Sequence, residues 1–510
     1  MKKQNIKFLI TVIFSMISCK SDFLDLANPN VQTSESYWKT EDDALKGVNA
    51  IYQGLYYDGT FLRFAQCALD FRGDDTMSPS TWDVMSNTGS FKLFNNTIMQ
   101  EWLWTAFFGG VNRANLVLDN IENIPFKDQN YKNRLKGEAL YLRALNNFYL
   151  VSFFNNIPLI LKSYKNSGEY FPSQATPEET WTQIMKDFDD ASKLLPSGYS
   201  NADLGRATKG AALAFLGKSY LFNKRYAEAA LKFKEVIDSK IYNLVSNYGE
   251  NFTESGENNP ESIFEVQFSR EAGGTTIGWV DVPNADWSKT TARAVTYAPA
   301  PFGWNDAAPT KWIFEEFKKE KTIEDQVDPR LKVSIYYNYP DCKLYGQSFQ
   351  QVYANETDKL GMKKYGNGDS GVIDEKDWRS GINERLMRYS DVLLMYAECL
   401  NELGNTGLCA DYIQKVRNRV KLPDRSTEFA GFTQAQMREQ LSHERALEFA
   451  FEGHRFDDIH RWGWLKDPLK LTELKQHDAE FNSYVQGREF FSIPQAEIQV
   501  NPNLRQNPGY

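Results

Sequence analysis

The chain has 510 residues, with 67 acidic and 58 basic side chains and a net charge of −9 at pH 7. Its content of 42% hydrophobic and 14% aromatic residues is enough for a large core, in one elaborated domain or several units. An acidic chain without basic clusters argues against a nucleic-acid partner, and five scattered cysteines do not make a disulfide framework.

The N-terminus has the form of an export signal. Lysines within the first seven residues precede an apolar run at 8–17, which is too short to span a bilayer as a helix. Ser18 then precedes Cys19, so residues 1–18 are predicted to be a secretory signal peptide. The segment is similar to a bacterial lipoprotein signal, in which Cys19 is acylated and anchors the mature chain. The alternative is a secreted protein with a free cysteine; no later run is long enough for a transmembrane helix.

Helices are expected wherever apolar residues recur at helical spacing. After a polar arm at 19–36, these segments are 41–56, 102–121, 134–154, 178–195, 310–319, 384–420 and 433–462. Two inserts interrupt them. The first, at about 58–97, is predicted to be irregular, and the second, at about 249–380, holds a strand at 261–268 and a loop at 269–309 rich in Gly, Thr and Pro. Long loops of this kind in a compact protein are usually functional.

Residues 206–237 predict a helical hairpin at the centre of the chain. Small and apolar residues there follow the spacing of a tetratricopeptide unit, at Leu213, Leu216, Gly217, Tyr220, Ala229 and Phe233. The same offsets recur at Leu393, Tyr396, Ala397, Leu400, Cys409 and Ile413. Cys399 and Cys409 lie within these apolar stripes and are expected in the core. One hairpin cannot bury its own apolar face, so a stacked helical scaffold broken by inserts is expected. The alternative is two ordinary amphipathic hairpins.

Several long motifs carry a family resemblance. They are RYSDVLLMYAECLNE at 388–402, VRNRVKLP at 416–423, HERALEFAFEGHRFDDIHRWG at 443–463, FSIPQAEIQVNPNLRQNPGY at 491–510, GEALYLRALNNFYLVSFFNNIPLI at 137–160 and RATKGAALAFLGKSYL at 206–221. In this order they resemble the SusD/RagB family of nutrient-binding outer-membrane lipoproteins of Bacteroidetes, over nearly the whole mature chain.

The resemblance implies a mostly α fold: one domain at 37–510, built on four tetratricopeptide-like helix pairs with irregular loop and short-strand inserts. It implies lipid anchoring at the outer membrane, facing the exterior. It also implies a SusC-like TonB-dependent transporter as partner, with ligand bound among the inserts.

Charged residues near the C-terminus fit a structural role better than a catalytic one. Glu444, Arg445, Glu448, Glu452, His454 and Arg455 lie at helical spacings, which predicts buried ion pairs and hydrogen bonds. The four histidines (His443, His454, His460 and His477) form no HExxH motif, and no CxxC is present, so no metal or cofactor is predicted. The acidic, Gly-rich segment 366–377 lacks the EF-hand ligand order and is interpreted as a solvated turn rather than a calcium site.

Candidate ligand-binding residues come from the two inserts. They are Arg72, Asp74, Asp75 and Trp82 in the first, and Trp279, Trp287 and Trp304 in the second. Sugars present apolar C–H faces that stack on indole rings, while charged and amide side chains hydrogen-bond their hydroxyls. Core packing is the alternative for each tryptophan, and we expect one or two of the four to touch ligand.

The favoured function is surface capture of an oligosaccharide or polysaccharide and its delivery to the transporter. One alternative is a non-glycan nutrient such as a peptide. The other is a glycan-degrading enzyme, which needs two carboxylates flanking the scissile bond. The adjacent pairs Asp74–Asp75 and Glu315–Glu316 point in different directions, and no nucleophile-elbow or triad signature is present, so no catalytic residue is predicted.

Overall fold

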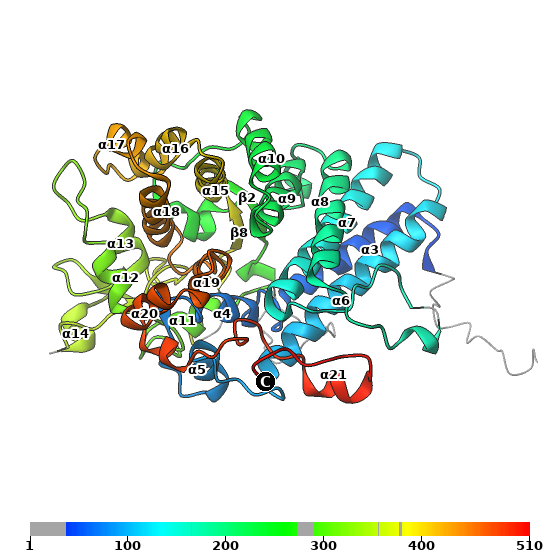
Figure 1. The fold of residues 1–510 in the computed structure, drawn as a ribbon, viewed down its shortest axis with the longest axis horizontal. Helices are drawn as coiled ribbons and strands as arrows, with labels where there is room; N and C mark the ends of the chain where they lie inside the picture. Colours follow the sequence, from blue (N-terminus) through cyan, green and yellow to red (C-terminus); the bar gives the residue numbers. More distant parts are fainter. Residues whose placement is uncertain (1–36, 165, 273–288, 355, 377–379) are drawn as a thin grey trace, which may run out of the picture.

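The computed structural model describes residues 37–164, 166–272, 289–354, 356–376 and 380–510, and helices dominate it (Figure 1). The first half contains α3 (Glu41–Gln53), α4 (Phe64–Asp70), α5 (Asp83–Gly89), α6 (Ile98–Asn120), α7 (Gln129–Phe154), α8 (Pro177–Leu194), α9 (Lys209–Phe222) and α10 (Tyr226–Asp238). The last part contains α15 (Tyr389–Glu402), α16 (Thr406–Arg419), α17 (Ser426–Ala430), α18 (Gln434–Glu448), α19 (Arg455–Arg461), α20 (Pro468–His477) and α21 (Gln495–Val500). The expected mostly α class is confirmed.

The long helices form one continuous stack. Each of α6 to α9 packs on the next helix in sequence, and α10 then packs on α15, which packs on α16. Figure 1 shows α8, α9, α10 and α15 side by side, although residues 239–388 separate α10 from α15 in sequence. The expected scaffold broken by a long insertion is therefore what the structure contains.

The small residues of the two hairpins allow their helices to approach closely. A Cβ atom at Gly217 of α9 would lie 2.6 Å from Cε1 of Phe233 on α10, closer than real Cβ contacts. In the second hairpin, the thiol of Cys409 on α16 donates to the carbonyl of Ala397 on α15 at 3.0 Å. Both Cys399 and Cys409 are buried, as predicted.

The inserts hold short elements. The middle of the chain contributes α11 (Arg293–Tyr297), α12 (Lys311–Glu316), α13 (Pro329–Ser334) and α14 (Phe349–Tyr353). The strands are β1 (Thr76–Met77), β2 (Ser262–Val266), β3 (Ala308–Pro309), β4 (Ile335–Tyr336), β5 (Lys343–Leu344), β6 (Gln347–Ser348), β7 (Gly361–Met362) and β8 (Glu384–Arg388). Among the described strands, the antiparallel pairs are β1–β3, β2–β8, β4–β7 and β5–β6.

Three predicted boundaries were wrong. The first insert is not irregular throughout, because α4 and α5 lie within it and every residue of α4 is buried. Residues 384–388 are strand rather than helix, because they pair with β2 from Ser262↔Arg388 to Val266↔Glu384. The helix expected at 433–462 is broken between α18 and α19, where Phe451 and Gly453 have positive φ angles of 62° and 75°.

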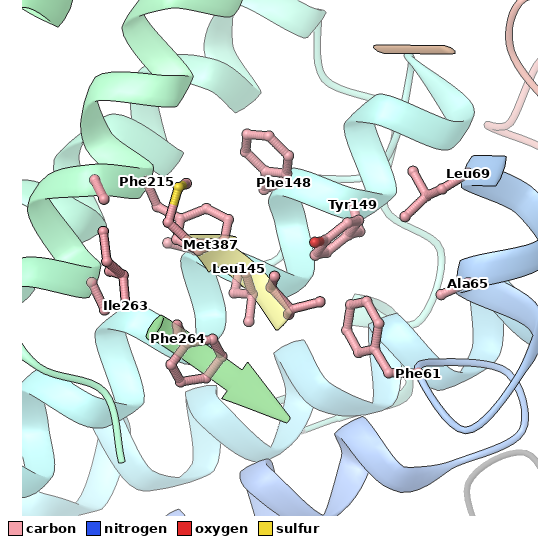
Figure 2. Close-up of a cluster of buried hydrophobic side chains, with 14 of the residues drawn as sticks. Phe61, Ala65, Leu69, Leu145, Phe148, Tyr149, Phe215, Ile263, Phe264 and Met387 are labelled. Atoms are coloured by element: carbon pink, nitrogen blue, oxygen red, sulfur yellow. The ribbon is translucent and has the colours of Figure 1, made fainter. Parts of the chain in front are cut away.

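The main core joins the scaffold to both inserts. Figure 2 shows Phe61, Ala65 and Leu69 from the first insert, Leu145, Phe148 and Tyr149 from α7, Phe215 from α9, Ile263 and Phe264 from β2, and Met387 from β8. The short β2–β8 pair thus lies inside the helical layers and contributes apolar side chains to them. Among the described helices, none has the length and apolar character needed to cross a membrane.

The C-terminal charges form a buried network, as predicted. Arg388 donates to Glu261, to Glu448 and, at 2.8 Å from its Nε, to Glu452. Burial alone would raise the pKa of Glu448, but the guanidinium groups of Arg419, Arg388 and Arg330 hold it well below its usual range. The predicted residues Glu444, Arg445, Glu448, Glu452, His454 and Arg455 are all buried. The two arginines and three glutamates each lie within ion-pair distance of an oppositely charged group, whereas burial lowers the pKa of His454, 3.6 Å from Asp391, to about 4.

Candidate functional site

The two inserts meet at the β1–β3 ladder. Thr76 pairs with Pro309 and Met77 with Ala308, and Thr310 donates its N–H to the carbonyl of Asp75 at 3.0 Å. The segments around Trp82 and Trp304 leave the same end of this ladder. Strand pairing therefore brings together two loops that are far apart in sequence.

Two serines fasten the Trp82 loop to the second insert. Ser78 Oγ donates to the carbonyl of Asp306 at 2.9 Å, and Ser80 Oγ donates to its Oδ1 at 2.5 Å. The backbone N–H of Trp82 in turn donates to Ser80 Oγ at 3.0 Å. Burial raises the pKa of Asp306 above its usual value, and the Ser80 hydrogen bond lowers it in part. The position of Trp82 is thus set by side chains of its own loop and by Asp306.

Arg63 lies between the two indoles. Its Nε and Nη2 donate to the carboxylate of Asp58 at 2.8 and 2.5 Å, which fixes the plane of the guanidinium. The guanidinium carbon is 5.4 Å from the ring centroid of Trp82 and 5.8 Å from that of Trp304. These are cation–π distances, so one buried, ion-paired arginine supports both rings.

A second aromatic layer lies behind Trp82. Phe64 is buried, and its ring centroid is 5.9 Å from that of Trp82 and 5.2 Å from that of Trp102, on which it stacks. The Trp82 side chain is 37% exposed, and Trp102 and Trp304 are half-buried. We call Arg63, Ser80, Trp82, Trp102, Trp304 and Asp306 the tryptophan cluster.

Arg72 was predicted to bind ligand, but its side chain is buried in the structure. Its Nη1 donates to the carbonyl of Glu489 at 2.9 Å, and its guanidinium carbon lies 4.2 Å from the ring centroids of Phe456 and Phe491. Burial lowers the pKa of Arg72 to about 10. It holds the C-terminal segment against α4 and does not line the tryptophan cluster.

Asp74 and Asp75 are also buried. Burial would raise the pKa of Asp74, but Arg455 and His477 pair with it and hold it at about 2. Asp75 accepts the N–H of Phe451 at 3.1 Å, and burial raises its pKa to about 7. Since both carboxylates are occupied by internal partners, neither reaches the surface that Trp82 presents.

Sequence reasoning missed four supporting residues of the cluster: Arg63, Ser80, Trp102 and Asp306. Arg63 precedes the residues predicted in the first insert and lies in the stretch predicted to be irregular, whereas Trp102 begins a predicted helix and resembles a core residue there. Asp306, two residues after Trp304, could not be recognised from the sequence, because its role depends on hydrogen bonds from Ser78 and Ser80 of the other insert. The other two predicted tryptophans, Trp279 and Trp287, lie outside the described residues.

The tryptophan cluster is an exposed aromatic surface, and several hollows lie elsewhere on the molecule. One of about 450 Å³ lies between α10 and α18, and another of about 550 Å³ lies between α12 and α18. Both are lined by ion pairs such as Arg438–Glu402 and His443–Glu316. Charges that already neutralise each other make these hollows poor candidates for a neutral sugar.

The described residues include no group of three His, Cys, Asp or Glu arranged to hold a metal ion. In the segment 366–377, Asn367 and Glu375 are buried, and Glu375 accepts hydrogen bonds from the hydroxyl of Tyr345 and the amide of Asn367. The middle of the segment is an exposed turn, with residues 369–371 and 373 exposed as the interpretation of a solvated turn predicts, whereas Asn367 and Glu375 near its two ends pack inward.

Comparison with known proteins agrees with this fold. The sequence matches the SusD family over residues 260–510, and a family described as "Starch-binding associating with outer membrane" over residues 22–221. The SusD-like protein P25 of Formosa agariphila is 25% identical over 558 residues, covering all of both chains.

Two solved structures are similar throughout. A SusD superfamily protein from Bacteroides vulgatus is 29% identical with a TM-score of 0.81, covering 93% of this chain and 100% of its own. A laminarin-binding SusD-like protein is 25% identical with a TM-score of 0.73 and the same coverage. The chain belongs to the SusD/RagB family.

Proposed function

We propose that this protein is a cell-surface receptor that binds an oligosaccharide at the tryptophan cluster and delivers it to a SusC-like TonB-dependent transporter. The observation that carries the binding step is the placement of Trp82 and Trp304 on either side of Arg63. Two partly exposed indoles held by one fixed cation form a rigid surface on which the C–H faces of sugar rings can stack.

Polar groups beside the rings supply hydrogen bonds for sugar hydroxyls. Ser80 and Asp306 lie next to Trp82, and both carry further acceptor capacity on their oxygens. Among the described residues, Nη1 of Arg63 has no hydrogen-bond partner, because Asp58 engages only Nε and Nη2. A few fixed polar groups beside an aromatic surface are typical of carbohydrate recognition.

The same geometry favours binding without turnover. A glycosidase places two carboxylates on either side of the scissile bond. At the tryptophan cluster, Asp58 is fully buried and paired with Arg63, and Asp306 is held by Ser80. The family description as starch-binding and the laminarin-binding relative support a receptor for neutral glucans. Incubation with glycans should therefore release no reducing ends.

Anchoring rests on the sequence and the family. The signal at 1–18 and Cys19 lie outside the described residues, and the matching family is described as associating with the outer membrane. We propose that lipidated Cys19 and the arm at 19–36 tether the domain at 37–510 to the outer surface. Cys19→Ala should abolish labelling by radioactive palmitate and release the protein from the membrane fraction.

A polysaccharide panel tests the binding site. Native gels containing laminarin, amylopectin or other glucans should retard the wild type. Trp82→Ala and Trp304→Ala should reduce the retardation, while Leu469→Ala, a change at an 82% exposed apolar residue on α20, should not. A panel that retards none of these proteins, combined with binding of a peptide mixture, would contradict the glycan proposal.

A further inference from the structure

A separate aromatic groove lies on the other side of α6 from the tryptophan cluster. It has a volume of about 400 Å³ and is bounded by α6, by the segments 158–164 and 166–172, and by the C-terminal segment that begins with α21. In Figure 1, α21 lies directly below α6. Trp102 and Trp104 are two positions apart on α6, so their side chains point in directions about 200° apart around the helix axis. One helix thus contributes an indole to each site.

The walls of the groove are held in place by hydrogen bonds. The side-chain amide of Asn501 donates to the carbonyl of Pro172 at 2.9 Å, and Asn503 donates to that of Phe171 at 2.7 Å. On the opposite wall, Asn115 donates to the carbonyl of Ile160 at 2.9 Å. The groove is therefore preformed, which lowers the cost of ordering it around a ligand.

Aromatic rings form the floor and one edge of the groove. Trp104 and Phe108 make the floor, with ring centroids 4.6 Å apart. At the edge, Tyr164 and Tyr170 are 38% and 55% exposed, and their ring centroids are 5.8 Å apart. Large aromatic side chains exposed together on a surface usually mark a binding site.

The polar lining fits an uncharged ligand. Among its lining residues, only Glu497 is charged, in contrast to the hollows lined by ion pairs. Within the described part of the chain, the side chains of Thr105, Asn112 and Glu497 have no hydrogen-bond partner. Burial raises the pKa of Glu497, and the nearby Glu101 adds to the shift. A ligand with apolar faces and many hydroxyl groups fits both the aromatic rings of the groove and its polar side chains.

We propose that this groove is a second carbohydrate-binding site, which takes a neutral oligosaccharide segment by stacking on Tyr164 and Tyr170. The proposal rests on the proposed glycan-binding function and adds a second point of contact with the same polymer. Two sites on one molecule raise the apparent affinity for a polysaccharide well above that for a short oligosaccharide, because the second contact becomes intramolecular when one polymer can reach both.

The experiment compares three variants of the full chain in native gels containing laminarin or amylopectin. The variants are the pair Tyr164→Ala/Tyr170→Ala, the pair Trp82→Ala/Trp304→Ala, and both pairs combined. Phe94→Ala is the control, because Phe94 is a 69% exposed aromatic residue outside the groove lining. Thermal unfolding confirms that each variant is folded, and calorimetry measures binding of laminarihexaose and maltoheptaose.

The tyrosine pair should weaken retardation by the polysaccharide at least threefold while the control matches the wild type. The tryptophan pair should leave a residual retardation that the combined variant loses. The second site is contradicted if the tyrosine pair behaves like the wild type, or if the tryptophan pair alone removes all retardation. If the tyrosine pair binds polysaccharide normally but loses a co-purifying outer-membrane protein, the groove is a protein interface. A wild type that no polysaccharide retards would contradict the proposed function itself.

Discussion

The C-terminal charge network and the tryptophan cluster both place arginine beside aromatic rings, but with opposite results. In the network, Arg388 is enclosed and contacts three carboxylates and the ring of Phe449. In the cluster, Arg63 has one carboxylate partner below and partly exposed indoles above. The first arrangement exposes no group that a ligand could contact, whereas the second presents ring faces to solvent. A family motif rich in charge can therefore be structural, while recognition lies in the inserts.

Removing the charge of Arg388 should have the largest effect on stability. Arg388→Met leaves Glu261, Glu448 and Glu452 buried near one another without this cation, and breaking a buried ion pair typically costs about 3–5 kcal/mol. Urea denaturation measures the change in the free energy of unfolding. Arg438→Met is the matched control, because Arg438 and its partner Glu402 are more exposed and such pairs contribute about 0–1 kcal/mol. Equal losses in both variants would show that the network is not what stabilises the fold.

Enlarging Gly217 should come next. Gly217→Val forces side-chain atoms into the ring of Phe233, and overpacking of this kind costs about 1–3 kcal/mol. The loss should shrink when Phe233→Leu is added, since the two residues are in direct contact. Gly198→Ala is the control: an added Cβ there meets nothing within 4 Å, so the unfolding free energy should change by less than about 0.5 kcal/mol. Additive effects of the Gly217 and Phe233 changes would argue against the close approach of α9 and α10.

His443 should make stability depend on pH. Burial would lower its pKa, but the hydrogen bond to Glu316 and the carboxylate of Glu320, 3.4 Å from Nε2, raise it from 6.5 to about 9. A pKa raised by folding means that the folded state binds the proton more tightly, so this contribution is complete below pH 6.5 and is lost between pH 6.5 and 9. His443→Gln should flatten the fall in urea midpoint over that interval. A wild-type midpoint that stays level across the same interval, or a variant that keeps the slope, would contradict this assignment.

The scaffold could be predicted from sequence because its signals are local. Gly217 and Phe233 are within one hairpin, and the spacing that brings them together is visible in the sequence. The candidate site was predicted only in part. Trp82 and Trp304 are partly exposed where the inserts meet, but Asp74 and Asp75 are covered by Arg455 and Phe451 from the far end of the chain. Such long-range partners leave no trace in local spacing, so charged insert residues could not be sorted into buried and exposed ones.

The sharpest test of the comparison is the change with the smallest expected effect on stability. Trp82→Ala removes a partly exposed ring that rests on Phe64 and Arg63, so the free energy of unfolding should fall by less than about 1 kcal/mol. Glucan binding should weaken about two- to tenfold, since one aromatic stack contributes about 0.5–1.5 kcal/mol. Calorimetry gives the affinity and urea denaturation the stability of the same sample. Trp82→Phe should recover part of the affinity, because a smaller ring still offers a stacking face. A variant that loses stability but keeps its affinity would place Trp82 with the scaffold rather than with the ligand.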